Sequence, residues 1–290
     1  FEGLATMNRL SKVDEREDFL TQIQKEAAEE LERAAGGLQR EKTIAGKSSL
    51  PPANRIPIPP GYGAHIVHQI PLQEVFDLLN RNELYRLSWG AKNAHGEEWV
   101  KLQAEFDNRL VTMRREALQS DWYKPQGAYG YWPAQSDGNT LIVYDPASLA
   151  SSKPVELTRF SFPRQDREDN LSLADYFRPL SSGEMDMVAF QVVTVGRCAT
   201  ERFDKLQAEN NYTEAYFHHG LAVQLAEASA EYLHGHVRRE LGLAADQGKR
   251  YSWGYPAIPE LADHARVFQL LPVESELDMS LTSAYQLVPE

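Results

Sequence analysis

The chain has 290 residues, of which 42% are hydrophobic and 25% charged, enough for one large globular domain or two smaller ones. Its formal net charge of −12 argues against nucleic acid or an anionic membrane as the main partner, because both bind basic surfaces. The single cysteine, Cys198, excludes an internal disulfide and fits a reducing cytoplasm. No apolar run approaches the ~18 residues of a membrane-spanning helix. We therefore expect a cytoplasmic protein that does not enter a membrane.

The N-terminal part of the chain is predicted to be a linker rather than a domain. Residues 11–35 are dense in helix formers with a narrow apolar stripe, so we expect a solvated linker helix within residues 1–45. Five prolines then predict an extended tether over residues 46–63, because proline fixes φ and lacks an N–H donor. The compact domain should cover residues 64–290.

Two helices are predicted at the start of that domain, over residues 72–89 and 97–119. The second helix has apolar residues at spacings of three and four, the pattern of a core-facing stripe: Trp99, Leu102, Phe106, Leu110 and Met113.

Strand signals follow these helices. Asp137-Gly138 between two apolar runs predicts a hairpin that pairs roughly Ala128–Ala134 with Thr140–Tyr144. Residues 155–162 alternate like a half-buried strand, and the short apolar run 187–196 ends in Gly, as a central strand does. Helices followed by strands and a further helix predict an α+β fold with a mostly antiparallel sheet.

That further helix, predicted over Thr213–Glu240 directly after the last strand, is apolar on two sides, which indicates burial. One strip between those sides holds polar residues: Gln224, Glu227, Glu231, His234 and Arg238. Carboxylates four residues apart repel each other, so helix stability does not explain this strip. Three hypotheses remain: the strip is solvated or neutralised by its own His and Arg, it ligates a metal, or a buried carboxylate awaits a cationic ligand.

Signatures of other chemistry are weak. Glu231-x-x-His234 has the spacing of a di-iron ligand pair, but such sites need a second pair on another helix and the sequence has none. A P-loop, a Gly-rich dinucleotide turn, CxxC and HExxH are all missing. We expect Cys198 to be a packed residue rather than a nucleophile, and His218 and His219 to pack or cap rather than ligate.

Residues 249–261, KRYSWGYPAIPEL, can form neither a helix nor a central strand. Gly254 permits backbone angles closed to other residues, while Pro256 and Pro259 fix φ and bias the residues before them toward extended forms. The segment is therefore a stiff loop that carries Arg250 among aromatic residues. Such loops often hold a ligand, although many only change the direction of the chain between two elements.

Four segments in this order and spacing resemble the C-terminal activation domain of cobalamin-dependent methionine synthase: GAYGYWPA, AFQVVTVG, LAEASAEYLHGHVRREL and RYSWGYPAIP. The resemblance runs from about residue 64 to the end, and residues 1–40 resemble the linker that follows the cobalamin-binding domain. It implies a single C-shaped α+β domain around a long, mostly antiparallel twisted sheet with flanking helices.

In that family the domain binds S-adenosylmethionine and repairs the synthase after its cobalt has been oxidised. The resemblance implies that a flavodoxin-like or other electron donor takes part in the reductive methylation of cob(II)alamin to methylcobalamin, which supports methyl transfer from methyltetrahydrofolate to homocysteine. Cobalamin would be held by another domain of the same protein, and zinc only by the homocysteine domain. This domain would supply no catalytic acid or base, because the cofactor carries the chemistry.

Matched position by position, the resemblance places the S-adenosylmethionine contacts on the loop and on the helix strip. Arg250 would bind the methionyl carboxylate with its guanidinium fork. Gly254, Tyr255 and Ala257 would line the ligand and face the corrin, and Glu227 would contact the ligand from the helix.

Three departures from the family pattern matter. Ile258 stands where the family often has Cys, and we expect it to pack. An acidic ligand contact falls on Asn80, with Asp77 as the other candidate equivalent. The family continues past Glu290 with a strand and a ligand-contacting tyrosine, so we expect a truncated C-terminus. These departures leave a second interpretation open, a structural module that docks on and caps the cobalamin domain with weak or lost S-adenosylmethionine binding.

Overall fold

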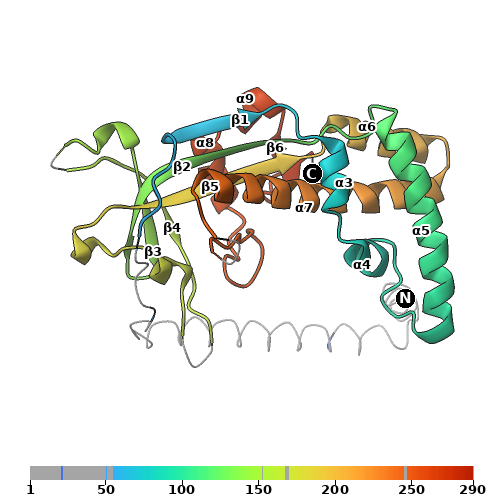
Figure 1. Ribbon diagram of the computed structural model, residues 1–290, viewed down its shortest axis with the longest axis horizontal. Coiled ribbons are helices and arrows are strands. Elements are labelled where there is room, and N and C mark those ends of the chain that lie inside the picture. Colours follow the sequence, from blue (N-terminus) through green and yellow to red (C-terminus); the bar gives the residue numbers. More distant parts are fainter. Residues whose placement is uncertain are drawn as a thin grey trace. The chain divides into compact units, whose positions relative to one another are not determined.

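The computed structural model describes Thr21, Leu50 and residues 55–289 other than 152, 167–169 and 245–246. The predicted linker helix, apart from Thr21, and residues 46–49 and 51–54 of the predicted tether lie outside the described residues. Leu50–Phe162 and Ser172–Glu290 form one compact unit, and every element named below belongs to it (Figure 1). The second unit takes in Pro163–Leu171, where Gln165 N–H donates to Leu171 O at 2.8 Å.

A five-stranded antiparallel sheet organises the large unit and confirms the predicted fold class. Its longest described strand, β2 (Gln126–Asp137), pairs along one edge with β5 (Asp186–Thr194). Along its other edge β2 pairs first with β1 (Gly63–Val67) and then with β3 (Thr140–Tyr144). Strand β4 (Glu156–Ser161) extends the sheet beyond β3.

The predicted register of the β2–β3 hairpin was wrong. Asp137 pairs with Thr140, so the turn lies at Gly138-Asn139, and β2 pairs with β3 only from Ala134 to Asp137. Gln135 and Ser136 resemble turn residues in sequence, yet both are buried in the strand. Both side chains are satisfied inside the strand, because Gln135 Nε2 donates to Glu184 O at 2.7 Å and Ser136 Oγ donates to Phe177 O at 3.1 Å.

The helix predicted over residues 72–89 is in fact three short pieces: α3 (Leu72–Asp77), α4 (Arg81–Glu83) and the π-helical turn η1 (Leu84–Ser88). The break occurs at Asn80, which is extended at ψ 94° and accepts a hydrogen bond from Glu83 N–H at 3.2 Å as the N-cap of α4. An N-cap residue has non-helical backbone angles, so a continuous helix cannot run through Asn80. The second predicted helix is confirmed as α5 (Gly96–Leu118), with Phe106, Leu110 and Met113 buried.

The sequence analysis missed α6 (Arg197–Ala208), which lies between β5 and the long helix α7 (Tyr212–Glu240). Gly196, at φ 87°, starts α6, and Asn210, at φ 59°, separates it from α7. The expectation that the long helix directly follows the strand was therefore wrong, although the bounds of that helix were predicted to within one residue.

Helix α7 is apolar on two sides because its two halves pack against different partners. Leu221 and Leu225, in its N-terminal half, belong to a core formed with α3, η1 and α5. Leu233 and Val237, in its C-terminal half, pack on the sheet face that carries Tyr129 and Tyr131. Ile56, from the predicted tether, packs against this second cluster, so contact with the unit begins before residue 64.

The opposite face of the sheet is covered by the C-terminal elements. Successive strand residues point to opposite faces, so Trp132 and Phe190 face α8 (Asp263–Leu270) and α9 (Val273–Leu277). Five minor elements complete the described structure: η2 (Pro146–Ser148), η3 (Leu173–Tyr176), η4 (Leu180–Ser182), β6 (Ser280–Leu281) and β7 (Leu287–Val288). Of the described helices, none combines the length and apolar character needed to cross a membrane.

Candidate functional site

A tight turn and an aromatic anchor hold the loop after α7 in one shape. Gly254 has φ 87°, in the left-handed region that favours glycine, and its N–H donates to Ile258 O at 2.9 Å. Ile258 N–H donates back to Tyr255 O at 2.9 Å, and the Ile258 side chain is buried as expected. The Trp253 ring stacks on Phe190 of β5, with 6.2 Å between centroids. This turn leaves Tyr255 at the surface, 64% exposed.

Arg250 joins this loop to the polar strip of α7. Its Nη2 donates to Glu227 Oε1 in an ion pair, and its Nη1 donates to Ser252 Oγ at 3.0 Å. Its Nε lies 3.7 Å from Glu231 Oε2. The loop and the strip, singled out separately in the sequence, therefore meet at one place.

The exposure of these side chains corrects one hypothesis about the strip. The Arg250 side chain is only 19% exposed, but those of Glu227 and Glu231 are 52% and 51% exposed. The hypothesis of a buried carboxylate was therefore wrong, because both carboxylates stand half in water and already lie beside a guanidinium.

The other residues of the strip contact protein groups on either side of this cluster. His234 Nε2 lies 2.8 Å from Gly248 O, so this nitrogen carries the proton, and Nδ1 lies 3.5 Å from Glu231 Oε1. Arg238 donates to Ala244 O rather than to a carboxylate. Arg250 thus contributes to neutralising the strip, a role that one of the three hypotheses from the sequence gave to His234 and Arg238. Within the described residues, no group of three His, Cys, Asp or Glu side chains is placed to hold a metal ion.

The structure does not bring Asn80 into this cluster. Its side chain caps α4, as described above, while Asp77 pairs with Arg114 at 2.6 Å. The link between the strip and this region is instead Gln224, whose Nε2 donates to Ser88 Oγ at 3.1 Å at the end of η1. Gln224 is buried, so it ties α7 to the segment that follows Asn80.

Cys198 and His218 have packing roles, as expected. Burial lowers the pKa of His218 to about 4, and its ring bridges Tyr123 Oη at 2.7 Å and Ala199 O at 2.9 Å. Nε2 must donate to the Ala199 carbonyl, so Nδ1 accepts from the Tyr123 hydroxyl. Burial also raises the pKa of the Cys198 thiol, which disfavours the reactive thiolate.

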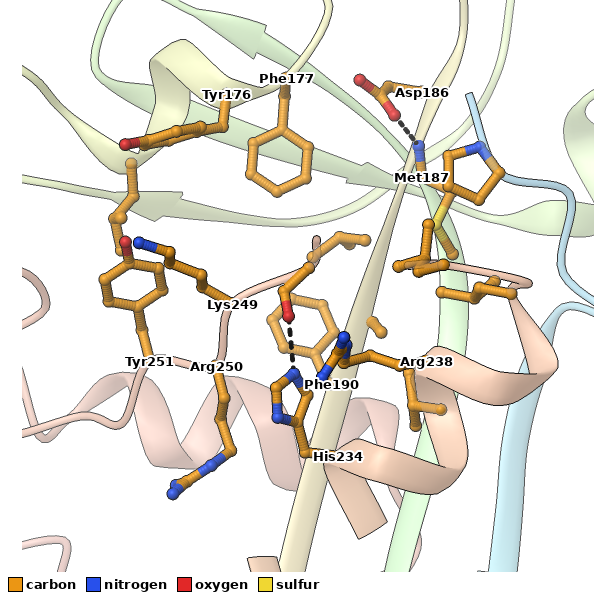
Figure 2. A pocket seen from close by; sticks show the side chains of 18 of the residues that line it. Tyr176, Phe177, Asp186, Met187, Phe190, His234, Arg238, Lys249, Arg250 and Tyr251 are labelled. Atoms are coloured by element: carbon orange, nitrogen blue, oxygen red, sulfur yellow. Dashed lines mark hydrogen bonds between the residues drawn. The ribbon is translucent and has the colours of Figure 1, made fainter. Parts of the chain in front are cut away.

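A cavity of about 620 Å³ lies beside the same loop (Figure 2). Its walls include Phe177, Phe190 and Tyr251, and Arg238 and Lys249 also line it. In Figure 2 the Arg250 side chain extends away from Phe177, so the guanidinium that meets Glu227 points away from the aromatic wall of the cavity. The sequence analysis missed this cavity, because its residues come from elements far apart in the chain.

Comparison with solved structures defines the class of fold. The chain is similar to a structure described as the MetH reactivation domain bound to AdoHcy, with a TM-score of 0.70 and 23% sequence identity. The match covers 81% of this chain and 77% of that one. At this level of identity the likeness shows the fold alone.

Sequence comparison then defines the family. The family model for the activation domain of vitamin B12 dependent methionine synthase matches residues 91–290, and the chain belongs to this family. The methionine synthase of Mycobacterium tuberculosis is 30% identical over 336 residues, which cover 100% of this chain and 28% of that protein. The methionine synthase of Mycobacterium leprae is 29% identical over 266 residues, which cover 81% of this chain. The chain spans only 28% and 22% of the length of these two relatives.

Proposed function

We propose that this domain binds S-adenosylmethionine where the loop of residues 249–258 meets the strip of α7, and that it reactivates a cobalamin-dependent methionine synthase. In that role cob(II)alamin takes one electron from a flavodoxin-like or other donor and a methyl group from S-adenosylmethionine, which leaves as S-adenosylhomocysteine. The methylcobalamin so formed returns to methyl transfer from methyltetrahydrofolate to homocysteine. Membership of the activation-domain family supports this role. The solved domain of the same fold, bound to AdoHcy, supports the ligand class.

The observation that carries the proposal is the cluster of Arg250, Glu227 and Glu231 at a half-exposed place. The methionyl end of S-adenosylmethionine has a carboxylate, an ammonium and a sulfonium. A guanidinium binds a carboxylate through two parallel hydrogen bonds, and carboxylates stabilise nearby cations. In the proposed complex the ligand carboxylate contacts Arg250 while its cationic groups lie toward Glu227 and Glu231. The ligand then replaces the internal ion pairs of Arg250 with Glu227 and Glu231 by intermolecular ones.

The remaining site residues have roles in binding and orientation. Gly254 gives the loop its turn, and exposed Tyr255 and partly exposed Ala257 line the ligand and face the incoming cobalamin domain. Asn80 stays a candidate contact for the far end of the ligand, next to the segment that Gln224 ties to α7. Cobalamin, held by another domain, supplies the cobalt that accepts the methyl group. This chain needs only to position that group, because a sulfonium is already a good leaving group.

Titration calorimetry with S-adenosylmethionine and its decarboxylated analogue tests the proposal. We expect saturable binding of the parent ligand, with a dissociation constant on the order of 100 µM or tighter. Loss of the carboxylate removes a charge-assisted contact of about 1.5–3 kcal/mol, so the analogue should bind roughly 10- to 150-fold more weakly. Equal affinity for the two compounds would contradict the placement on Arg250.

The second candidate function is a structural module that docks on the cobalamin domain and caps it. Its supporting observation is that Arg250 is already neutralised by Glu227 and Glu231, so the loop is braced with protein groups alone. This function predicts no heat of S-adenosylmethionine binding at millimolar concentration together with retained affinity for a cobalamin-domain fragment.

A further inference from the structure

The cavity beside the loop borders the Arg250 cluster: Arg250 and His234 line it, whereas Glu227 and Glu231 do not. One wall is the edge of β5, which pairs only with β2 within the described sheet, and the facing wall is the loop segment that carries Lys249 and Tyr251. Its volume of about 620 Å³ lies within the range of small-molecule sites, roughly 300–1,000 Å³. We propose that this cavity binds a second ligand, a small planar aromatic anion.

The aromatic part of this ligand is matched by flat rings from three separate elements. Phe177 follows η3, Phe190 lies on β5, and Tyr251 lies on the loop, where the residue is 42% exposed (Figure 2). Aromatic rings prefer offset-stacked or edge-to-face contacts, and walls built from such rings favour a flat partner over a branched one.

The negative charge of the ligand is indicated by cations that have no anion beside them. Among the described residues Arg238 and Lys249 make no ion pair; Arg238 donates to the neutral Ala244 carbonyl, and its Nε is buried without a hydrogen-bond partner. The carboxylate that lines the cavity, Asp186, already accepts from the backbone N–H of Met187 at 2.7 Å and of Arg178 at 2.9 Å.

Three other basic side chains line the cavity. Arg55 adds a further cation, whereas His234 and Arg250 have Glu231 beside them. The chain carries a net charge of −12, yet Arg238 and Lys249 line this apolar wall without a carboxylate partner among the described residues. They select an anion and repel the sulfonium of S-adenosylmethionine, so this site lies beyond the proposed function and does not depend on it.

The test uses the fluorescent anion anilinonaphthalene sulfonate and its neutral analogue N-phenylnaphthylamine. We expect one equivalent of the anion to bind to the native chain, and the neutral probe to bind at least about tenfold more weakly. Arg238→Gln should weaken binding of the anion about tenfold and leave the neutral probe unchanged. Lys249→Gln, at an exposed position, provides a second variant that keeps the fold and should weaken the anion a few-fold.

Arg239→Gln is the matched control, because Arg239 is the next residue of α7 but is exposed and does not line the cavity. It should change neither probe. Equal losses in the Arg238 and Arg239 variants, equal affinity for the two probes, or no saturable binding to the native chain would each overturn the proposal. Displacement of the probe by excess S-adenosylmethionine would also overturn it, since the cavity would then be part of the first site. Failure of S-adenosylmethionine binding alone leaves these results unchanged.

Discussion

The polar residues in the two halves of α7 differ in burial and in the kind of partner that they contact. In the N-terminal half, His218 and Gln224 are buried and bonded to fixed groups of neighbouring elements. In the C-terminal half, Glu227 and Glu231 are half exposed, and their partner is a side chain of a loop, Arg250. Buried polar groups with fixed partners stabilise the fold, because leaving them unpaired is costly. Half-exposed charges that meet across a loop can exchange one partner for a ligand.

The largest expected effect concerns pH and the N-terminal half. The pKa of His218 falls from 6.5 to about 4 on folding, because burial disfavours the charged ring. The stability from its neutral form is therefore present above pH 6.5 and is lost as the pH falls toward 4. This group should lower the free energy of unfolding by about 3 kcal/mol across that range, measurable by urea denaturation at a series of pH values.

Two controls sharpen this result. A proton NMR titration of His218 should give a midpoint near 4 in the folded chain, and S-adenosylmethionine affinity per folded molecule should not follow the stability loss. A His218 ring that titrates near 6.5 would remove the contrast between the two halves.

A smaller effect comes from a matched pair of substitutions on the same strip. Gln224→Met keeps the side-chain volume but leaves Ser88 without its partner, so the free energy of unfolding should fall by about 1–2 kcal/mol with little change in ligand affinity. Glu231→Gln removes a half-exposed charge, so stability should change by less than about 0.5 kcal/mol, while S-adenosylmethionine binding weakens roughly two- to fivefold. Urea denaturation and calorimetry on both variants check this. A large stability loss in Glu231→Gln together with weakened ligand binding in Gln224→Met would contradict the proposed difference between the two halves of α7.

The sequence predicted those parts of the fold that local chemistry determines. The period of α7 and α5 and the composition of the sheet strands follow from burial of one or two faces, so their bounds were close. The missed features depend on long-range partners. Asn80 breaks a predicted helix by capping a new one, and Gln135 and Ser136 stay in β2 because distant carbonyls accept their hydrogen bonds.

In the candidate site, too, local sequence predicts some features while others depend on long-range contacts. Helical periodicity alone placed Glu227 and Glu231 on one strip, and the prolines alone predicted a stiff loop. The loop and the strip meet because the chain folds back on itself between Glu227 and Arg250, which are 23 residues apart. No local sequence pattern specifies this contact. The cavity depends on still more distant partners, because Phe177 and Tyr251 come together only through the tertiary fold.

The most direct test is to measure melting temperature and S-adenosylmethionine affinity on one preparation of Arg250→Ala. Binding should weaken roughly 10- to 150-fold, because a charge-assisted contact of about 1.5–3 kcal/mol is lost. Stability without ligand should change by less than about 1 kcal/mol, because water solvates the two half-exposed carboxylates that remain. Arg250→Lys should recover only part of the affinity, since an ammonium lacks the fork. A large fall in melting temperature with unchanged affinity per folded molecule would show that Arg250 only braces the loop.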